Sequence, residues 1–131
     1  MTNTIKLAII DDDEIHHKII ERLVRAHPAF ELVHRAYNGQ EFLSKMKDVD
    51  VLPDICIVDL EMPVMNGVET TKNIAAKYPM VKIVGYTAVR KAEVKNQMLS
   101  SGAMAVLSKN EPEMLLRFLE QLVNICGLKS A

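Results

Sequence analysis

Residues 55–59 read ICIVD, a short apolar run that ends on a carboxylate, and three other segments of the chain have the same arrangement. Apolar runs also precede Asp11 and Asp12, Thr87, and Lys109. Short runs rich in Ile and Val that alternate with helical patterns are typical of buried strands in a parallel sheet. Parallel strands present their carboxyl ends on one edge, where ligands of open α/β sheets bind. We therefore expect the polar residues that end the four runs to converge.

The composition is that of one globular domain. The chain has 131 residues, of which 49% are hydrophobic, so we expect a single domain over 1–131 with its core within about 5–126. A net charge of -1, from 16 basic and 17 acidic residues, does not favour direct binding of nucleic acid or a membrane. We find no signal-peptide pattern and no apolar stretch near ~18 residues, so we expect a cytoplasmic protein.

Strand and helix patterns alternate along the chain, as they do in doubly wound α/β folds. Strands are predicted at about 6–10, 30–36, 55–59, 81–86 and 105–108. Five helices are predicted. The first begins at about 14 and ends at His27-Pro28, and the second follows the Asn38-Gly39 turn. The third spans 68–78, the fourth spans 91–101, and the fifth follows Glu111-Pro112. The sequence therefore predicts an α/β fold with five strands in one parallel sheet.

The helices differ in how much apolar surface they offer. In the first helix, the predicted buried face consists of Ile15, Ile19, Leu23 and Ala26. His16 and His17 point about 100° apart on that helix and are expected to be solvated surface residues. The helix over 91–101 has few apolar anchors, so we expect it to be loosely held and mobile. The last helix carries a wide apolar stripe, which could contact a partner or a second copy.

Clustered carboxylates repel one another unless a cation neutralises them. Mg²⁺ binds through one or two carboxylates together with water and a substrate phosphate. Asp12 and Asp59 are the ligands that we expect from the residues alone, with Asp11 as a third negative charge nearby. Mg²⁺ and Lys109 together would offset these three charges and leave a site suited to an incoming phosphoryl group.

Phosphoryl transfer requires mainly positioning and the neutralisation of charge on the phosphoryl oxygens. A nucleophilic Asp, a metal ion, a lysine and a hydroxyl group are sufficient for this purpose. Asp59 would be the nucleophile, Thr87 would donate a hydrogen bond to one oxygen, and Lys109 would place its charge beside another.

These motifs make the chain similar to the receiver domains of two-component response regulators, over nearly its whole length. The segments that carry the resemblance, in order, are IIDDDEI, VDLEMPVMNG, GYTA and GAMAVLSK. The resemblance implies a flavodoxin-like (βα)5 fold with strand order 2-1-3-4-5. It also implies a phosphoprotein that acts as a switch in a phosphorelay. Such a regulator catalyses its own phosphorylation and dephosphorylation but is not a metabolic enzyme.

The resemblance assigns a role to each site residue. Asp59 is the phosphorylated residue, and it would bind Mg²⁺ together with Asp12, the backbone carbonyl of Glu61, and Asp11 acting through water. Thr87 and Lys109 would sense the phosphoryl group. Glu61 and Val89 stand at positions that tune how fast the aspartyl phosphate hydrolyses. The donor would be a phosphohistidine on a sensor histidine kinase or phosphotransfer protein, and output would involve the fourth and fifth helices.

Two residues depart from the family pattern. Asn110 follows Lys109, where many members have a proline after a cis bond; a cis bond before Asn would cost about 2.5–4 kcal/mol, so we expect a trans bond. Val106 stands where many members have an aromatic residue that turns inward when the Thr moves. These features resemble the class of receiver that carries a C-terminal helix-turn-helix domain, and we expect no such domain within this chain.

Other interpretations remain open for the individual residues. The acidic run at Asp11 could serve only to cap a helix, and Thr87 or Lys109 alone could be structural, but their occurrence at four strand ends favours a site. The alternative function is a Mg²⁺-dependent phosphohydrolase with an Asp nucleophile, although that class usually has its nucleophile after the first strand. A flavin module of flavodoxin type is disfavoured because Asp11–Asp13 would repel the flavin phosphate.

Overall fold

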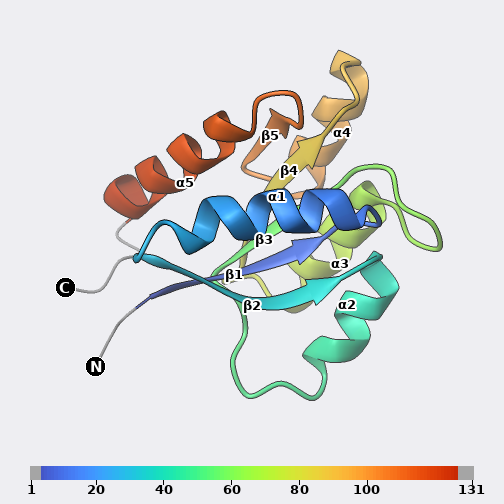
Figure 1. Ribbon diagram of the computed structural model, residues 1–131. Helices are drawn as coiled ribbons and strands as arrows, with labels where there is room; N and C mark the ends of the chain where they lie inside the picture. The colour runs from blue at the N-terminus through green and yellow to red at the C-terminus, as the bar shows by residue number, and fades with distance from the viewer. Residues whose placement is uncertain (1–3, 127–131) are drawn as a thin grey trace.

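The computed structural model describes residues 4–126, apart from the side chains of Ile125 and Cys126. Five strands form one parallel sheet in the order β2-β1-β3-β4-β5, which confirms the predicted fold (Figure 1). The strands are β1 Ile5–Ile10, β2 Phe30–Ala36, β3 Ile55–Val58, β4 Lys82–Thr87 and β5 Ala105–Ser108. The helices are α1 Glu14–Arg25, α2 Gly39–Met46, α3 Gly67–Lys77, α4 Ala92–Ser101 and α5 Pro112–Cys126.

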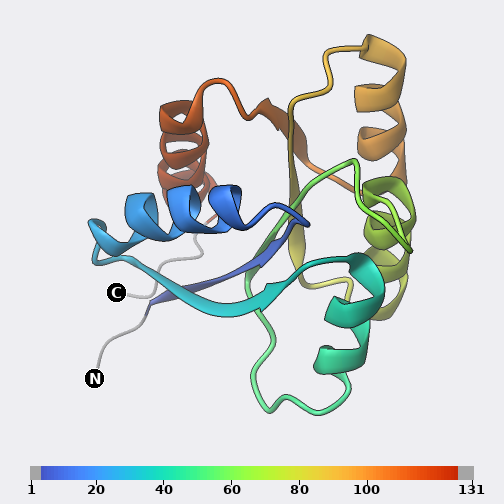
Figure 2. The same ribbon diagram turned by 45° about the vertical axis from the view of Figure 1, so that its right-hand side comes forward.

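The sheet is covered on both faces, with α1 and α5 on one side and α2, α3 and α4 on the other (Figure 2). Successive strand residues point to opposite faces, so Leu7 and Ile9 pack with α1 and α5 whereas Ala8 and Ile10 pack with α2, α3 and α4. Strands buried on both faces read as continuous apolar runs. This arrangement explains why the strands were recognisable in the sequence. Within the described residues, no helix is both long enough and apolar enough to cross a membrane.

Side-chain caps begin three helices close to the carboxyl ends of the strands. Asp13 accepts a hydrogen bond from the amide of Ile15 at the start of α1. Asn38 caps α2 and Asn66 caps α3, each by accepting the amide hydrogen of a residue three positions later. Because these side chains occupy amide groups that the helices leave without internal partners, each loop enters its helix in a defined direction.

The predicted buried face of α1 is wrong. The residues that α1 buries are His17, Ile20 and Val24, whereas Ile15 is 65% exposed. Both sets have helical spacing, so periodicity alone does not distinguish them; in the observed orientation His17 Nε2 lies within hydrogen-bond distance of the backbone oxygen of Asp11. The surface prediction for His17 is therefore also wrong. Ile15 instead lines a shallow hollow that Pro112 of α5 borders.

Helix α4 is anchored mainly by one side chain. The structure describes all of α4, and Met98 is its one buried residue. The hydroxyl of Thr71 in α3 lies 3.7 Å from the sulfur of Met98, and Leu99 is exposed. Lys91, the residue immediately before α4, makes no side-chain hydrogen bond that caps the helix. The small number of anchors agrees with the expectation from the sequence, and the mobility of α4 stays a prediction.

Shortening Met98 tests this anchoring. Met98→Ala removes the buried contact of α4, and such truncations cost about 2–5 kcal/mol when the whole protein depends on them. We expect most of the effect to be local, so amide hydrogen exchange should speed up within 92–101 far more than in β1 or β3. Leu99→Ala, at the exposed neighbouring position, is the control and should leave exchange unchanged. Equal acceleration across the sheet in Met98→Ala would show that α4 does not open separately.

Candidate functional site

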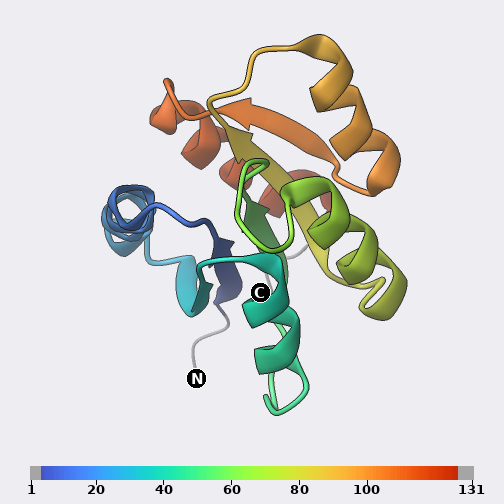
Figure 3. The same ribbon diagram turned by 90° about the vertical axis from the view of Figure 1, so that its right-hand side faces the viewer.

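The carboxyl ends of β1, β3, β4 and β5 meet at one edge of the sheet, which faces the viewer in Figure 3. Asp11, Asp12 and Asp59 each place a carboxylate oxygen there, and these oxygens lie within 4.8 Å of one another. Asp11 is 2% exposed and Asp59 is 5% exposed, whereas Asp12 is open to solvent. The predicted acidic residues are therefore brought together, with one open side.

Backbone hydrogen bonds hold the two buried carboxylates in place. The amide of Asp59 donates to the carbonyl of Ile10 over 2.9 Å, which continues the pairing of β1 with β3 beyond the last strand residue. The amide of Leu60 donates to Oδ1 of Asp59 over 2.8 Å. The amide of Asp13 donates to Oδ1 of Asp11 over 2.9 Å. Each carboxylate is thus oriented by the loop that follows its strand.

Lys109 joins the two buried carboxylates. Its Nζ lies 2.8 Å from Oδ2 of Asp11 and 3.3 Å from Oδ2 of Asp59, and the lysine side chain is only 8% exposed. The backbone amide of Lys109 donates to the carbonyl of Thr87 over 3.0 Å, so pairing of β4 with β5 positions the side chain. One ammonium group serves two carboxylates, which leaves a net negative charge at the site.

This excess of negative charge affects the proton equilibrium of Asp59. Burial raises the pKa of the Asp59 carboxyl to about 6, and the neighbouring carboxylate of Asp11 acts in the same direction. Lys109 and the amide of Leu60 oppose the rise. A bound cation would favour the ionised form. The oxygen donors and the open side at Asp12 fit a hard divalent ion, so this cluster could hold a metal.

Gly67 lets the loop after β3 lie against the backbone of Asp59 and Leu60 at the sheet edge. Its amide donates to the carbonyl of Leu60 over 2.8 Å. A Cβ at this position would lie 2.3 Å from the backbone oxygen of Asp59 and 2.6 Å from Cα of Leu60. Only glycine fits so close to the backbone. The sequence did not reveal the contact of Gly67 with Asp59, because that contact depends on the path of the whole loop.

Thr87 lies at the same edge and is buried. Its hydroxyl oxygen accepts a hydrogen bond from the amide of Val89 over 3.1 Å, so its own proton stays available for another acceptor. The described residues contain no cis peptide bond, and the bond between Lys109 and Asn110 is therefore trans, as expected. Val106 is partly buried against the core beneath α4.

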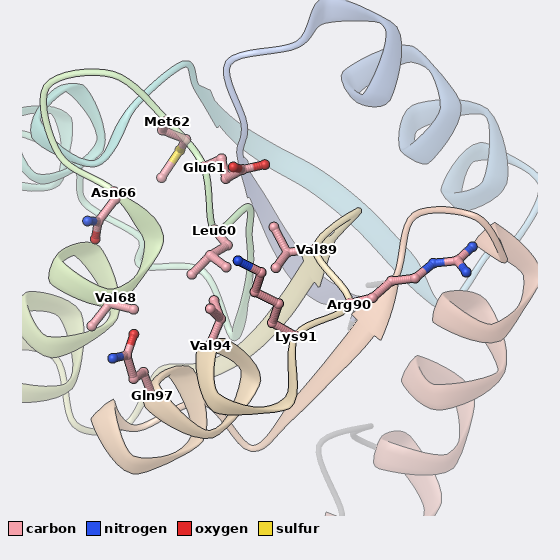
Figure 4. A pocket seen from close by; sticks show the side chains of 10 residues that line it. All are labelled: Leu60, Glu61, Met62, Asn66, Val68, Val89, Arg90, Lys91, Val94 and Gln97. Carbon is pink, nitrogen blue, oxygen red and sulfur yellow. The ribbon is translucent and has the colours of Figure 1, made fainter.

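A groove of about 700 Å³ opens beside the site, between the loop after β3 and helix α4 (Figure 4). Leu60 and Val89 border it on the side of the site, and Val94 lies on α4. The side chain of Lys91 extends toward the groove, whereas that of Arg90 points away from it. Glu61 and Val89, the two positions predicted to tune hydrolysis, both line the groove. The role of the Glu61 backbone carbonyl as a metal ligand stays a prediction.

Comparisons with known proteins agree on one family. The model of the response regulator receiver domain matches residues 7–120. The chain is 35% identical over 106 residues to the transcriptional regulatory protein LnrK of Bacillus subtilis, covering 81% of this chain and 47% of LnrK. It is 34% identical over 110 residues to a protein-glutamate methylesterase/protein-glutamine glutaminase of Halalkalibacterium halodurans, covering 83% of this chain and 31% of that protein. The chain thus spans less than half of the length of these two relatives.

Solved structures show the same fold. The signal receiver domain of the response regulator NarL from Mycobacterium tuberculosis superposes with a TM-score of 0.84 at 18% identity, covering 94% of this chain and 98% of that one. The response regulator domain of Thermotoga maritima CheB gives a TM-score of 0.82 at 22% identity, covering 93% and 98%.

The raised pKa of Asp59 predicts how stability depends on pH without metal. The folded-state value of about 6 lies above the ordinary value of about 3.9. The folded protein therefore binds a proton more tightly than the unfolded one, so stability falls as the pH rises from about 4 to 6, and the full loss is present above about pH 6. In EDTA at pH 8, Asp59→Asn should raise the free energy of unfolding by about 1–3 kcal/mol.

The gain should shrink as the pH falls from about 7 to 4, because wild type then recovers the lost stability. Urea unfolding at several pH values measures this difference. Asp50→Asn, at an exposed position, is the control and should show no such pH-dependent gain. A benefit of Asp59→Asn that persists unchanged at pH 4 would contradict the explanation.

Proposed function

This chain belongs to the response regulator receiver domain family, and from that membership we propose that it is a phosphoacceptor switch whose phosphorylated residue is Asp59. The donor is a phosphohistidine on a sensor histidine kinase or phosphotransfer protein, and the reaction requires Mg²⁺. We expect the protein to act in the cytoplasm, where kinases form phosphohistidine from ATP. The observation that carries the proposal is the position of the Asp59 carboxylate, buried beside Asp11 and within reach of the Lys109 ammonium group.

The transfer exchanges one bond to phosphorus for another. A carboxylate oxygen of Asp59 attacks the phosphorus atom, the bond from phosphorus to the imidazole nitrogen breaks, and the electron pair stays with the leaving histidine. The product is an acyl phosphate on Asp59. The chain mainly supplies charge and position for this step. Lys109 already lies between the two buried carboxylates and would contact a phosphoryl oxygen after the transfer.

The metal site would use the residues that converge at the sheet edge. Asp12 and Asp59 would bind Mg²⁺ directly, the Glu61 backbone carbonyl would complete the protein ligands, and Asp11 would act through water. When bound, Mg²⁺ neutralises charge on the carboxylates and on the phosphoryl oxygens. Support for this assignment comes from the mutual distances of the three acidic side chains and from the solvent-open position of Asp12.

The signal would leave the site through Thr87. Its hydroxyl proton can be donated to a phosphoryl oxygen, and its oxygen already holds the amide of Val89. A shift of Thr87 would therefore pull on the loop that borders the groove and leads into α4. Helix α4 has one buried anchor, Met98, so a small displacement of the loop can favour another position of the helix. An output protein or a second copy of the chain would recognise the altered surface of α4 and α5.

Intact-mass measurement tests the phosphoacceptor. Wild-type protein incubated with phosphoramidate and Mg²⁺ should gain the mass of one phosphoryl group, because Asp59 supplies the nucleophilic oxygen. Asp59→Asn should not gain it at a comparable rate, and EDTA should prevent the gain in wild type. Asp54→Asn, at the amino end of the same strand, keeps an oxygen that can accept from the Lys6 amide and is the matched control.

Equal uptake by Asp59→Asn and wild type would rule out the assignment. Continuous release of phosphate from a small phosphate ester, without an accumulated acyl phosphate, would instead favour the phosphohydrolase alternative.

Replacing Thr87 separates phosphoryl uptake from its consequence. Thr87→Val keeps the side-chain shape but removes the hydroxyl group, so the protein should still accept a phosphoryl group from phosphoramidate. The amide chemical shifts of 89–101 should then move at least severalfold less on phosphorylation than they do in wild type. Thr4→Val removes an exposed hydroxyl bonded to Glu31 and should leave the response intact. Shifts of wild-type size in Thr87→Val would exclude this route.

A further inference from the structure

We infer that His17 is a positioning residue for the metal site, because its imidazole fixes the peptide that joins Asp11 to Asp12. The inference rests on the proposed function, since it concerns how the same site binds Mg²⁺. His17 is 0% exposed, and its Nε2 lies 2.7 Å from the backbone oxygen of Asp11. A carbonyl oxygen can only accept a hydrogen bond, so Nε2 carries the proton and donates.

The bond from His17 completes the restraint of Asp11. The amide of Asp11 donates to the carbonyl of Ala36 over 3.0 Å. One carboxylate oxygen accepts from the amide of Asp13, and the other lies beside Lys109. The carbonyl is the remaining polar group of Asp11, and it belongs to the peptide plane that leads into Asp12. Rotation of this plane would change the position of the Asp12 carboxylate relative to those of Asp11 and Asp59.

The ring of His17 is itself held from the side. Tyr37, the first residue after β2, packs its ring on that of His17. The two ring centroids are 4.5 Å apart, and the ring planes make an angle of 35°. The hydroxyl of Tyr37 donates to the carboxylate of Glu14 at the start of α1. Tyr37 therefore packs on the imidazole while it is bound to the same helix, which limits the rotation of the His17 side chain.

A histidine at this position is costly for the core, which favours a role beyond packing. Its Nδ1 is buried and has no hydrogen-bond partner among the described residues. Burying an unpaired polar atom destabilises a fold, and an aliphatic residue at the same position on α1 would avoid that cost. Departures from local packing rules are expected where a residue serves a site.

A titration with Mg²⁺ separates positioning from packing. We expect His17→Leu to raise the half-saturating Mg²⁺ concentration about tenfold, as followed by NMR shifts of the amides of Asp12 and Leu60, which corresponds to about 1.4 kcal/mol. His17→Gln, whose amide can donate to the same carbonyl, should recover most of the loss. His34→Leu is the matched control, since His34 also contacts a backbone oxygen, but that oxygen belongs to Val51 in the loop before β3 and not to a residue of the acidic cluster.

Stability provides the second readout. Metal-free His17→Leu removes the unpaired Nδ1 but also leaves the Asp11 carbonyl without its donor, so its melting temperature should change little. A purely structural role predicts a clear loss of stability with unchanged Mg²⁺ affinity. The wild-type protein alone provides a third readout that does not depend on any variant folding. Its two-bond ¹⁵N–¹H spectrum should show a proton on Nε2 of His17, and a proton on Nδ1 alone would overturn the inference.

The outcomes distinguish this inference from the function on which it rests. If wild type binds Mg²⁺ and both His17 variants bind it equally well, the positioning role is wrong and the proposed function stands. If wild type binds no Mg²⁺, the proposed function fails and the positioning role fails with it.

Discussion

The central constraint in this structure is the repulsion between two buried carboxylates, Asp11 and Asp59, that share one ammonium group. Parallel pairing of β1 with β3 brings them together, and pairing of β4 with β5 delivers Lys109 to the same place. Burial and the neighbouring carboxylate of Asp11 together raise the pKa of Asp59, and the negative balance of charge would favour a bound cation. The fold thus brings together carboxylates whose mutual repulsion is unfavourable, and a divalent ion bound at this cluster would offset that repulsion.

The surrounding elements position the carboxylates at the sheet edge while the apolar core stays fully packed. Two apolar layers hold the sheet rigid, and side-chain caps fix the direction of the loops at its edge. Gly67 lets the loop after β3 approach the backbone of Asp59. Helix α4, by contrast, has a single buried anchor. The contrast between a well-packed sheet edge and a lightly anchored helix suits the proposed switch, since a change of charge at the edge could then shift the surface around α4.

The sequence was sufficient to predict the strands and the residues at their ends, because both follow from local patterns. The strand order came from the resemblance to receiver domains. The features that the sequence did not predict depend on contacts between distant segments of the chain. The face of α1 was misassigned because Ile19 and Leu23 have the same spacing as Ile20 and Val24. The hydrogen bond that satisfies the buried His17 is made to Asp11, in the loop before the helix, and helical periodicity does not reveal it. The contact of Gly67 with Asp59 likewise depends on the path of a whole loop.

The most direct measurement is a crystal structure of the protein grown with Mg²⁺ and beryllofluoride, an analogue of the phosphoryl group. The account predicts beryllium bonded to a carboxylate oxygen of Asp59, Mg²⁺ bound beside it by Asp12, and the Lys109 ammonium and Thr87 hydroxyl on the fluorine atoms. Beryllofluoride bound at another residue, or Mg²⁺ bound with Asp59 uninvolved, would contradict it.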